Sequence, residues 1–153
     1  MIQRIQTFYL LVVVILSGFS LFTPVADFIS EQHLYTLNYK GLMVLENNQS
    51  VCFLNTWPLT VINSIILIIA LVSIFLYKKR IRQIRLNVLN GLLMAGYYVL
   101  FFMYIWAAKE RLNVDITFHV VASFHLVNII LTFLAIRAIG KDEALVRSID
   151  RLR

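Results

Sequence analysis

The sequence contains only one cysteine, Cys52. A single thiol excludes an intramolecular disulfide and a metal site built from paired cysteines, and we interpret it as a small buried apolar side chain. Charged residues are also scarce, at 14% of the 153 positions, whereas about a quarter is usual in soluble domains. Hydrophobic residues make up 60%. A soluble fold of this length could not bury so much apolar surface, so the composition indicates a membrane protein.

No Asp, Glu, Lys or Arg lies near the centre of the four long apolar runs, which cover about residues 5–24, 58–77, 86–108 and 116–139. Each run is about as long as a helix that crosses a bilayer core. We therefore expect an all-α membrane protein, a four-transmembrane-helix bundle in a single integral membrane domain over residues 1–153. We interpret the first run as a retained helix, not a cleaved signal peptide, because only Arg4 precedes it and no clear cleavage site follows.

Residues 25–57 differ from the apolar runs and form the predicted first outer loop. Tyr35, Leu37 and Tyr39 alternate with polar residues, which is the period of a β-strand. Residues 46–50 read as a turn, and Val51 to Leu54 are a second short strand candidate. The pattern predicts a small β-hairpin or sheet that must pack on the helices, because an isolated hairpin is marginal in water.

A strongly basic segment at residues 78–85 separates the second and third spans and is expected to be a loop. Its five cations, which we assign to topology and lipid headgroup contact, are Lys78, Lys79, Arg80, Arg82 and Arg85. Four spans place both termini on the side of this segment. That side carries eleven basic residues, namely these five with Arg4, Arg137, Lys141, Arg147, Arg151 and Arg153, and the other side carries Lys40, Lys109 and Arg111. Basic residues favour the cytoplasm, so both termini are predicted to be cytoplasmic.

The last segment, residues 141–153, follows Gly140, which allows a helix break. Its apolar residues are spaced as in a short basic amphipathic helix. Two interpretations stay open, a helix on the anionic inner leaflet and a docking site for a cytoplasmic partner. The residues of this possible docking site are Leu145, Arg147, Ile149, Arg151 and Leu152.

Polar residues inside the spans are few, and they are the first place to look for function. His125, Asn128 and Thr132 share one face of the fourth span near mid-membrane, and His119 lies closer to the outer surface. One interpretation is a haem or metal ligand, or a proton relay, with His119, His125 and Asn128 as candidate cofactor-binding residues. Haem between helices needs a second axial ligand, and no other span contains a histidine. The residues favour interhelical hydrogen bonds, and we expect no cofactor and no metal site.

Three residues of the third span, Asn87, Gly91 and Ala95, are spaced by four. Small residues at this spacing let helices approach closely. The pattern favours packing within the bundle, and a homo-oligomer formed through this face is the alternative.

The two ends of the chain carry recognisable motifs, Met1–Thr7 opening the first span and Lys141–Ser148 with Asp150–Arg153 at the close. With four spans, they resemble an uncharacterised family of inner-membrane proteins from Bacteroidota-type bacteria, domain of unknown function 4293. The resemblance implies a location in the bacterial inner (cytoplasmic) membrane. It implies no activity, so no functional residues are transferred.

These features together predict a protein that is not an enzyme. We expect a non-enzymatic accessory or assembly protein that contacts the bilayer and a membrane-protein partner through its outer loop and basic cytoplasmic face. Nucleic acid is not an expected partner, because the basic residues flank apolar spans. The alternative is a ligand-binding or redox membrane protein that uses His125 and His119. A small transporter or channel would need a continuous polar path, which so few polar residues hardly supply.

Overall fold

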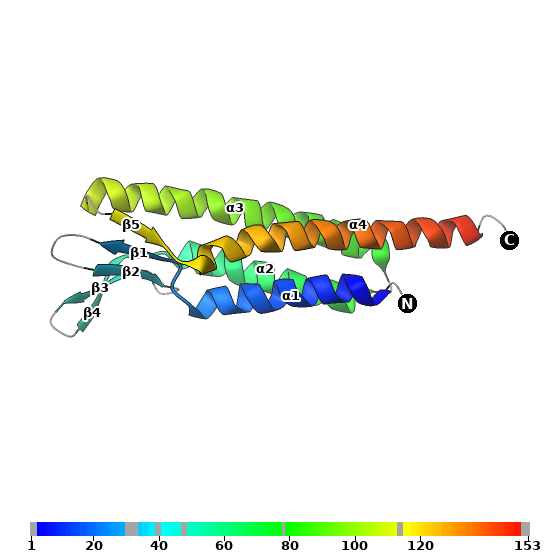
Figure 1. The fold of residues 1–153 in the computed structure, drawn as a ribbon, viewed down its shortest axis with the longest axis horizontal. Helices are drawn as coiled ribbons and strands as arrows, with labels where there is room; N and C mark the ends of the chain where they lie inside the picture. The colour runs from blue at the N-terminus through cyan, green and yellow to red at the C-terminus, as the bar shows by residue number, and fades with distance from the viewer. Residues whose placement is uncertain are drawn as a thin grey trace.

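Four long helices lie side by side, and a small antiparallel sheet stands at one end of them (Figure 1). The computed structural model describes residues 3–29, 34–38, 41–46, 49–77, 79–112 and 115–150. All four helices are long and apolar enough to cross a membrane, as predicted. Their bounds are α1 Gln3–Phe22, α2 Trp57–Phe75, α3 Arg80–Leu112 and α4 Phe124–Asp150. We call the end with the strands the sheet end, and the end where α1 begins and α4 finishes the basic end.

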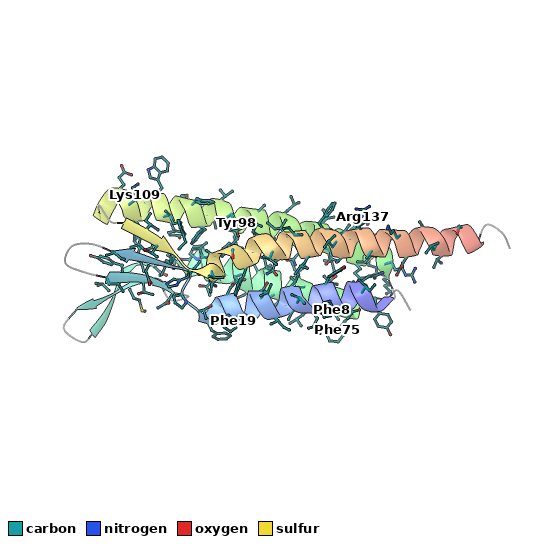
Figure 2. The ribbon with its side chains drawn as sticks, in the orientation of Figure 1. Phe8, Phe19, Phe75, Tyr98, Lys109 and Arg137 are labelled. Atoms are coloured by element: carbon teal, nitrogen blue, oxygen red, sulfur yellow. The ribbon has the colours of Figure 1, made fainter. Side chains whose placement is uncertain are left out.

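The shortest helix, α2, sets the thickness of the apolar belt. Its 19 residues rise about 28 Å, which matches a hydrocarbon core of roughly 30 Å. Pro58 stands in its first turn, where a missing backbone N–H costs little. Trp57 and Trp106 are exposed near the sheet end, as expected for aromatic residues at a membrane boundary. Lys109 lies near the sheet end and Arg137 lies toward the basic end (Figure 2).

The sheet contains five strands in the order β4-β3-β2-β1-β5. The strands are β1 Ala26–Ile29, β2 Leu34–Asn38, β3 Gly41–Glu46, β4 Gln49–Leu54 and β5 Asp115–Phe118. The prediction of strands within residues 25–57 is confirmed by β2, β3 and β4. Strands β1 and β5 were not predicted, because four-residue strands leave too few positions for an alternating pattern. The connection between α3 and α4 therefore supplies the fifth strand, β5, at one edge of the sheet.

The predicted start of the fourth span at residue 116 is wrong. Residues Asp115–Phe118 pair with β1, opposing Ile116 to Phe28 and Thr117 to Asp27. A 3-10 turn, η1 at Val120–Ser123, follows, and α4 begins at Phe124. Hydropathy cannot separate a short apolar strand from the first turns of a helix, and the β-branched Ile116 and Thr117 suit a strand.

The helices also extend beyond the predicted spans at the basic end. Residues 80–85, predicted as a loop, are the first turns of α3, and Lys78 lies outside the described residues. Helix α4 continues through Gly140 to Asp150, so the predicted break is wrong while the helical tail is confirmed as far as it is described. Lys and Arg are good helix formers, and one interior glycine costs only about 1 kcal/mol. The lengths of the apolar runs therefore underestimate the lengths of α3 and α4.

One face of the sheet packs against the sheet-end half of α3. Phe28 and Leu42 from the strands join Ile105 and Ala108 from α3 in one buried cluster. Tyr35, Leu37 and Val44 add to the same cluster. This contact supplies the support that a small sheet needs, and it fixes the sheet on the bundle.

Candidate functional site

His125 is buried in the first turn of α4 and touches two other helices. Its ring stacks on that of Tyr97 from α3, with centroids 4.0 Å apart and an interplanar angle of 3°. Its Nε2 lies 3.1 Å from Oδ1 of Asn63 on α2. The candidate span runs from Val120 to Val146, so His125 lies toward the sheet end. The predicted mid-membrane depth of His125, Asn128 and Thr132 stays a prediction.

A hydrogen-bond network continues from His125 to α1. Asn63 Nδ2 donates to Ser20 Oγ at 2.7 Å, and Asn128 Nδ2 donates to Ser17 Oγ at 3.0 Å. Both serines are buried on α1. Ser17 therefore binds Asn128, while Tyr97 meets His125 by ring stacking. Side chains of all four helices therefore meet around His125, and the network is arranged as an interhelical joint.

A second polar layer lies deeper in the bundle. Asn90 is seven residues from Tyr97 on α3, and Thr132 is seven residues from His125 on α4. Two turns, or about 10 Å, therefore separate each from the stacked pair, so they lie at one depth on facing antiparallel helices. Both amide atoms of Asn90, Oδ1 of Asn128 and Oγ1 of Thr132 have no hydrogen-bond partner among the described residues. Such a group costs about 1–3 kcal/mol when buried.

The sequence-based prediction missed Asn90 as a site residue. The side chain of Asn90 is fully buried inside the bundle. The sequence analysis of this span concerned Asn87, Gly91 and Ala95 instead. The available signal was the seven-residue spacing from Tyr97, which becomes informative only when the register of α3 and α4 is known.

At the basic end, buried polar groups tie the helices together again. Ser73 Oγ donates to Asn87 Oδ1 at 2.8 Å, which joins α2 to α3. Gln6 Nε2 of α1 donates to Oδ2 of the buried Asp142 on α4. Arg80 Nη1 of α3 donates to the backbone oxygen of Asp142 at 2.9 Å. The role of Asp142 as a junction of three helices was not predicted from the sequence.

The residues Asn87, Gly91 and Ala95, which are spaced by four, do not lie on a single face of α3. Asn87 is buried, Gly91 is half-buried and Ala95 is exposed. A Cβ added at Gly91 would meet nothing within 4 Å, so no described part of the chain approaches it closely. Steps of four residues turn by about 40° each time, which carries the stripe from the core to the surface. The packing interpretation therefore holds for Asn87 alone.

His119 lies at the junction of the sheet and α4. Its Nε2 is 2.9 Å from Oδ2 of Asp27 on β1, and both side chains are partly exposed. Its backbone N–H donates to the oxygen of Val25 at 3.1 Å. Among the described residues no group of three His, Cys, Asp or Glu side chains could hold a metal ion. The contact joins the end of β5 to β1.

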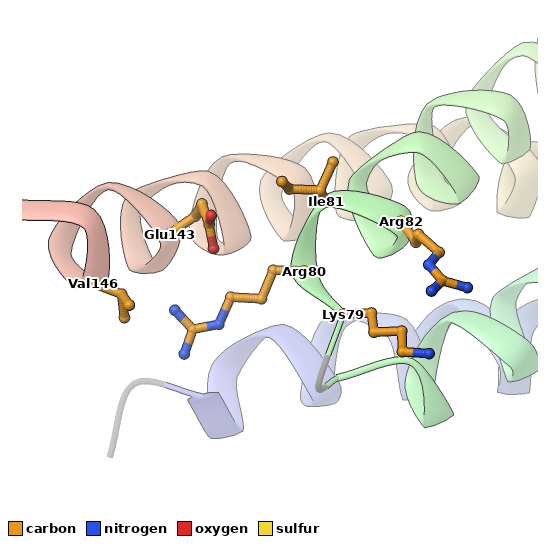
Figure 3. Close-up of a pocket in the computed structure, with 6 residues that line it drawn as sticks. All are labelled: Lys79, Arg80, Ile81, Arg82, Glu143 and Val146. Carbon is orange, nitrogen blue, oxygen red and sulfur yellow. The ribbon is translucent and has the colours of Figure 1, made fainter. Parts of the chain in front are cut away.

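A pocket of about 400 Å³ opens at the basic end, between the start of α3 and the end of α4 (Figure 3). Its lining residues are Lys79, Arg80, Ile81, Arg82, Glu143 and Val146. Three of the five predicted headgroup-contact cations therefore line one pocket, while Arg85 is exposed outside it.

The predicted docking tail is described only in part. Leu145 is 55% exposed. Arg147 and Ile149 belong to α4, but their side chains lie outside what the structure describes, and Arg151 and Leu152 lie outside it entirely.

The sequence was also compared with known proteins. The comparison with curated proteins found no match. A family described as Domain of unknown function (DUF4293) matches residues 2–152, which is nearly the whole chain. The predicted resemblance, drawn from the motifs at both ends, is thereby confirmed. The chain, with its four apolar helices and five-stranded sheet, belongs to the DUF4293 family.

Proposed function

We propose that this protein is a non-enzymatic accessory or assembly protein of the bacterial inner membrane. It binds a protein partner through the sheet on the outer side and contacts the cytoplasm through its basic end. The observation that carries the proposal is the position of β4, a six-residue strand at the edge of the sheet.

The orientation rests on the distribution of cations. Arg80, Arg82 and Arg85 begin α3, Arg137 is at the middle of α4, and Lys141 lies in its second half. Lys109 is near the other end of α3 (Figure 2). Basic residues gather on the cytoplasmic side of membrane proteins, which supports a cytoplasmic basic end and an outer sheet.

An edge strand offers a row of backbone N–H and C=O groups to an incoming strand. Strand β4 pairs with β3 on one side, and among the described residues no strand pairs with its other side. The β3–β4 hairpin also lies at the far side of the sheet from β5 (Figure 1). Proteins use such edges to bind extended segments of partners, with backbone hydrogen bonds supplying affinity. The partner we propose is therefore an extended segment of a protein on the outer side.

Site-specific photocrosslinking in native membranes tests the proposal. A photoreactive residue at Ser50 on β4 is expected to give one discrete heterologous adduct. The matched control is Val99 on α3, which is 70% exposed on the apolar surface of the bundle and should label only lipid. If Ser50 gives the same adducts as Val99, or if only the uncrosslinked chain is recovered, the proposal is wrong.

A second candidate function is ligand binding within the bundle. Asn90 and Thr132, which have buried polar atoms with no hydrogen-bond partner among the described residues, favour it, because buried polar groups in a membrane usually have partners. His125 is a weaker centre for a ligand or redox group, since Asn63 and Tyr97 already contact its ring. An absorption spectrum of the purified protein tests whether the bound ligand is a coloured redox group. A chromophore that is lost in His125→Ala would support it, and a colourless preparation would remove it.

A further inference from the structure

The pocket at the basic end combines charge with apolar surface. Its volume of about 400 Å³ falls in the range of small-molecule sites, roughly 300–1,000 Å³. We propose that it binds the phosphate of an anionic lipid headgroup in the cytoplasmic leaflet. This inference goes beyond the proposed function, which concerns a protein partner at the opposite end of the molecule.

The charges that line the pocket favour an anion. Lys79, Arg80 and Arg82 contribute three cations, whereas Glu143 is the one acidic lining residue. The first turn of α3 contains no acidic residue that would compensate them. The residues that line the pocket therefore carry a net formal charge of +2.

Arg80 is held in place without losing its charge. Its Nη1 donates to the backbone oxygen of Asp142, a neutral acceptor, at 2.9 Å. Figure 3 shows its side chain reaching from α3 toward α4, beside Glu143. A guanidinium carries five N–H donors, and this contact uses one of them. A positioned arginine suits phosphate recognition, because less conformational entropy is lost when the anion binds.

The apolar part of the pocket favours a lipid over free phosphate. Ile81 and Val146 line it and are both more than one-third exposed. Phe75 and Tyr77 are exposed where α2 ends, at the same end of the bundle. A ligand with a phosphate and acyl chains matches both kinds of surface, and basic pockets between helices on the cytoplasmic side bind anionic headgroups.

Two exposed cations can be removed without touching the part-buried hydrogen bond of Arg80 to Asp142. Lys79→Gln and Arg82→Gln are each expected to weaken binding of phosphatidylglycerol about fivefold. The matched controls are Arg85→Gln and Arg137→Gln, which remove exposed cations outside the lining. Glu143→Gln is expected to strengthen binding about fivefold, a gain that a misfolded chain would not show.

The test uses the full chain in mixed micelles of phosphatidylglycerol and phosphatidylcholine, with bound lipid counted by native mass spectrometry. We expect preferential retention of phosphatidylglycerol, losses in the two pocket variants, a gain in Glu143→Gln, and little change in the controls. Equal losses in pocket and control variants would assign the effect to diffuse surface charge and overturn the proposal. A second arm adds inorganic phosphate against chloride of equal ionic strength. Displacement of the lipid by phosphate alone would identify free phosphate as the ligand and also overturn it.

Discussion

The rings of His125 and Tyr97 lie face to face, with centroids 4.0 Å apart and planes 3° apart. This contact joins α4 to α3, and Asn63 joins the same histidine to α2 at 3.1 Å. Since both a ring face and Nε2 are engaged by neighbouring helices, the arrangement supports a structural role for His125. The energetic coupling between His125 and its neighbours can be measured, and it distinguishes a structural role from a ligand site.

The coupling between His125 and Asn63 is expected to be about 0.6 kcal/mol, and at most about 1.7 kcal/mol, the values found for side-chain hydrogen bonds inside membranes. A double-mutant cycle of His125→Ala and Asn63→Ala, followed by equilibrium unfolding in mixed micelles, gives this value. Ser64→Ala replaces Asn63→Ala in the control cycle, because Ser64 Oγ donates to the oxygen of Thr60 in its own helix. Coupling of equal size in both cycles would contradict the proposed joint.

For the polar layer of Asn90 and Thr132, we expect that removing a polar group raises the stability of the protein. Thr132→Val preserves shape and removes an unpartnered hydroxyl, so the free energy of unfolding should rise by about 1 kcal/mol. Ser73→Ala is the comparison variant and should lower it, because Ser73 donates to Asn87. The same unfolding assay measures both variants. A fall in stability for Thr132→Val would show that the hydroxyl binds something in the membrane, which would favour the second candidate function.

These two layers show what the sequence could and could not predict. Four apolar runs and the alternation around Tyr35 and Leu37 were enough for the four helices and most of the sheet. The strand at Asp115–Phe118 was hidden, because its pairing partner β1 lies almost ninety positions earlier in the sequence. The matching depth of Asn90 and Thr132 depends on the register of two antiparallel helices, which no local pattern reveals. Local periodicity therefore predicts the helices and strands, whereas the positions of the buried polar residues relative to one another depend on long-range packing.

The orientation of the chain predicts a clear labelling pattern. In a Cys52→Ser background, Thr117→Cys on β5 should react with a membrane-impermeant maleimide in spheroplasts. Lys79→Cys at the basic end should react only after permeabilisation, and Ser148→Cys near the end of α4 should follow Lys79→Cys. All three positions are exposed, so accessibility depends on the side of the membrane. The reverse pattern would place the sheet in the cytoplasm and contradict the proposed orientation.

The central claim is that a partner adds a strand at the open edge of β4, and a proline substitution tests it most directly. Successive N–H groups of an antiparallel strand point alternately toward and away from the neighbouring strand. Of Ser50 and Val51, one N–H therefore faces β3 and the other faces the open edge. Proline removes an N–H, and edge strands tolerate this where it faces solvent. Hydrogen exchange of β3 identifies which proline variant retains the sheet, and Ser50→Ala and Val51→Ala are the matched controls.

The decisive measurement is the amount of partner that co-purifies from native membranes with the sheet-retaining proline variant. We expect this variant to lose the partner while both alanine controls keep it. Undiminished recovery of the partner with an edge proline in an intact sheet would contradict strand addition at β4.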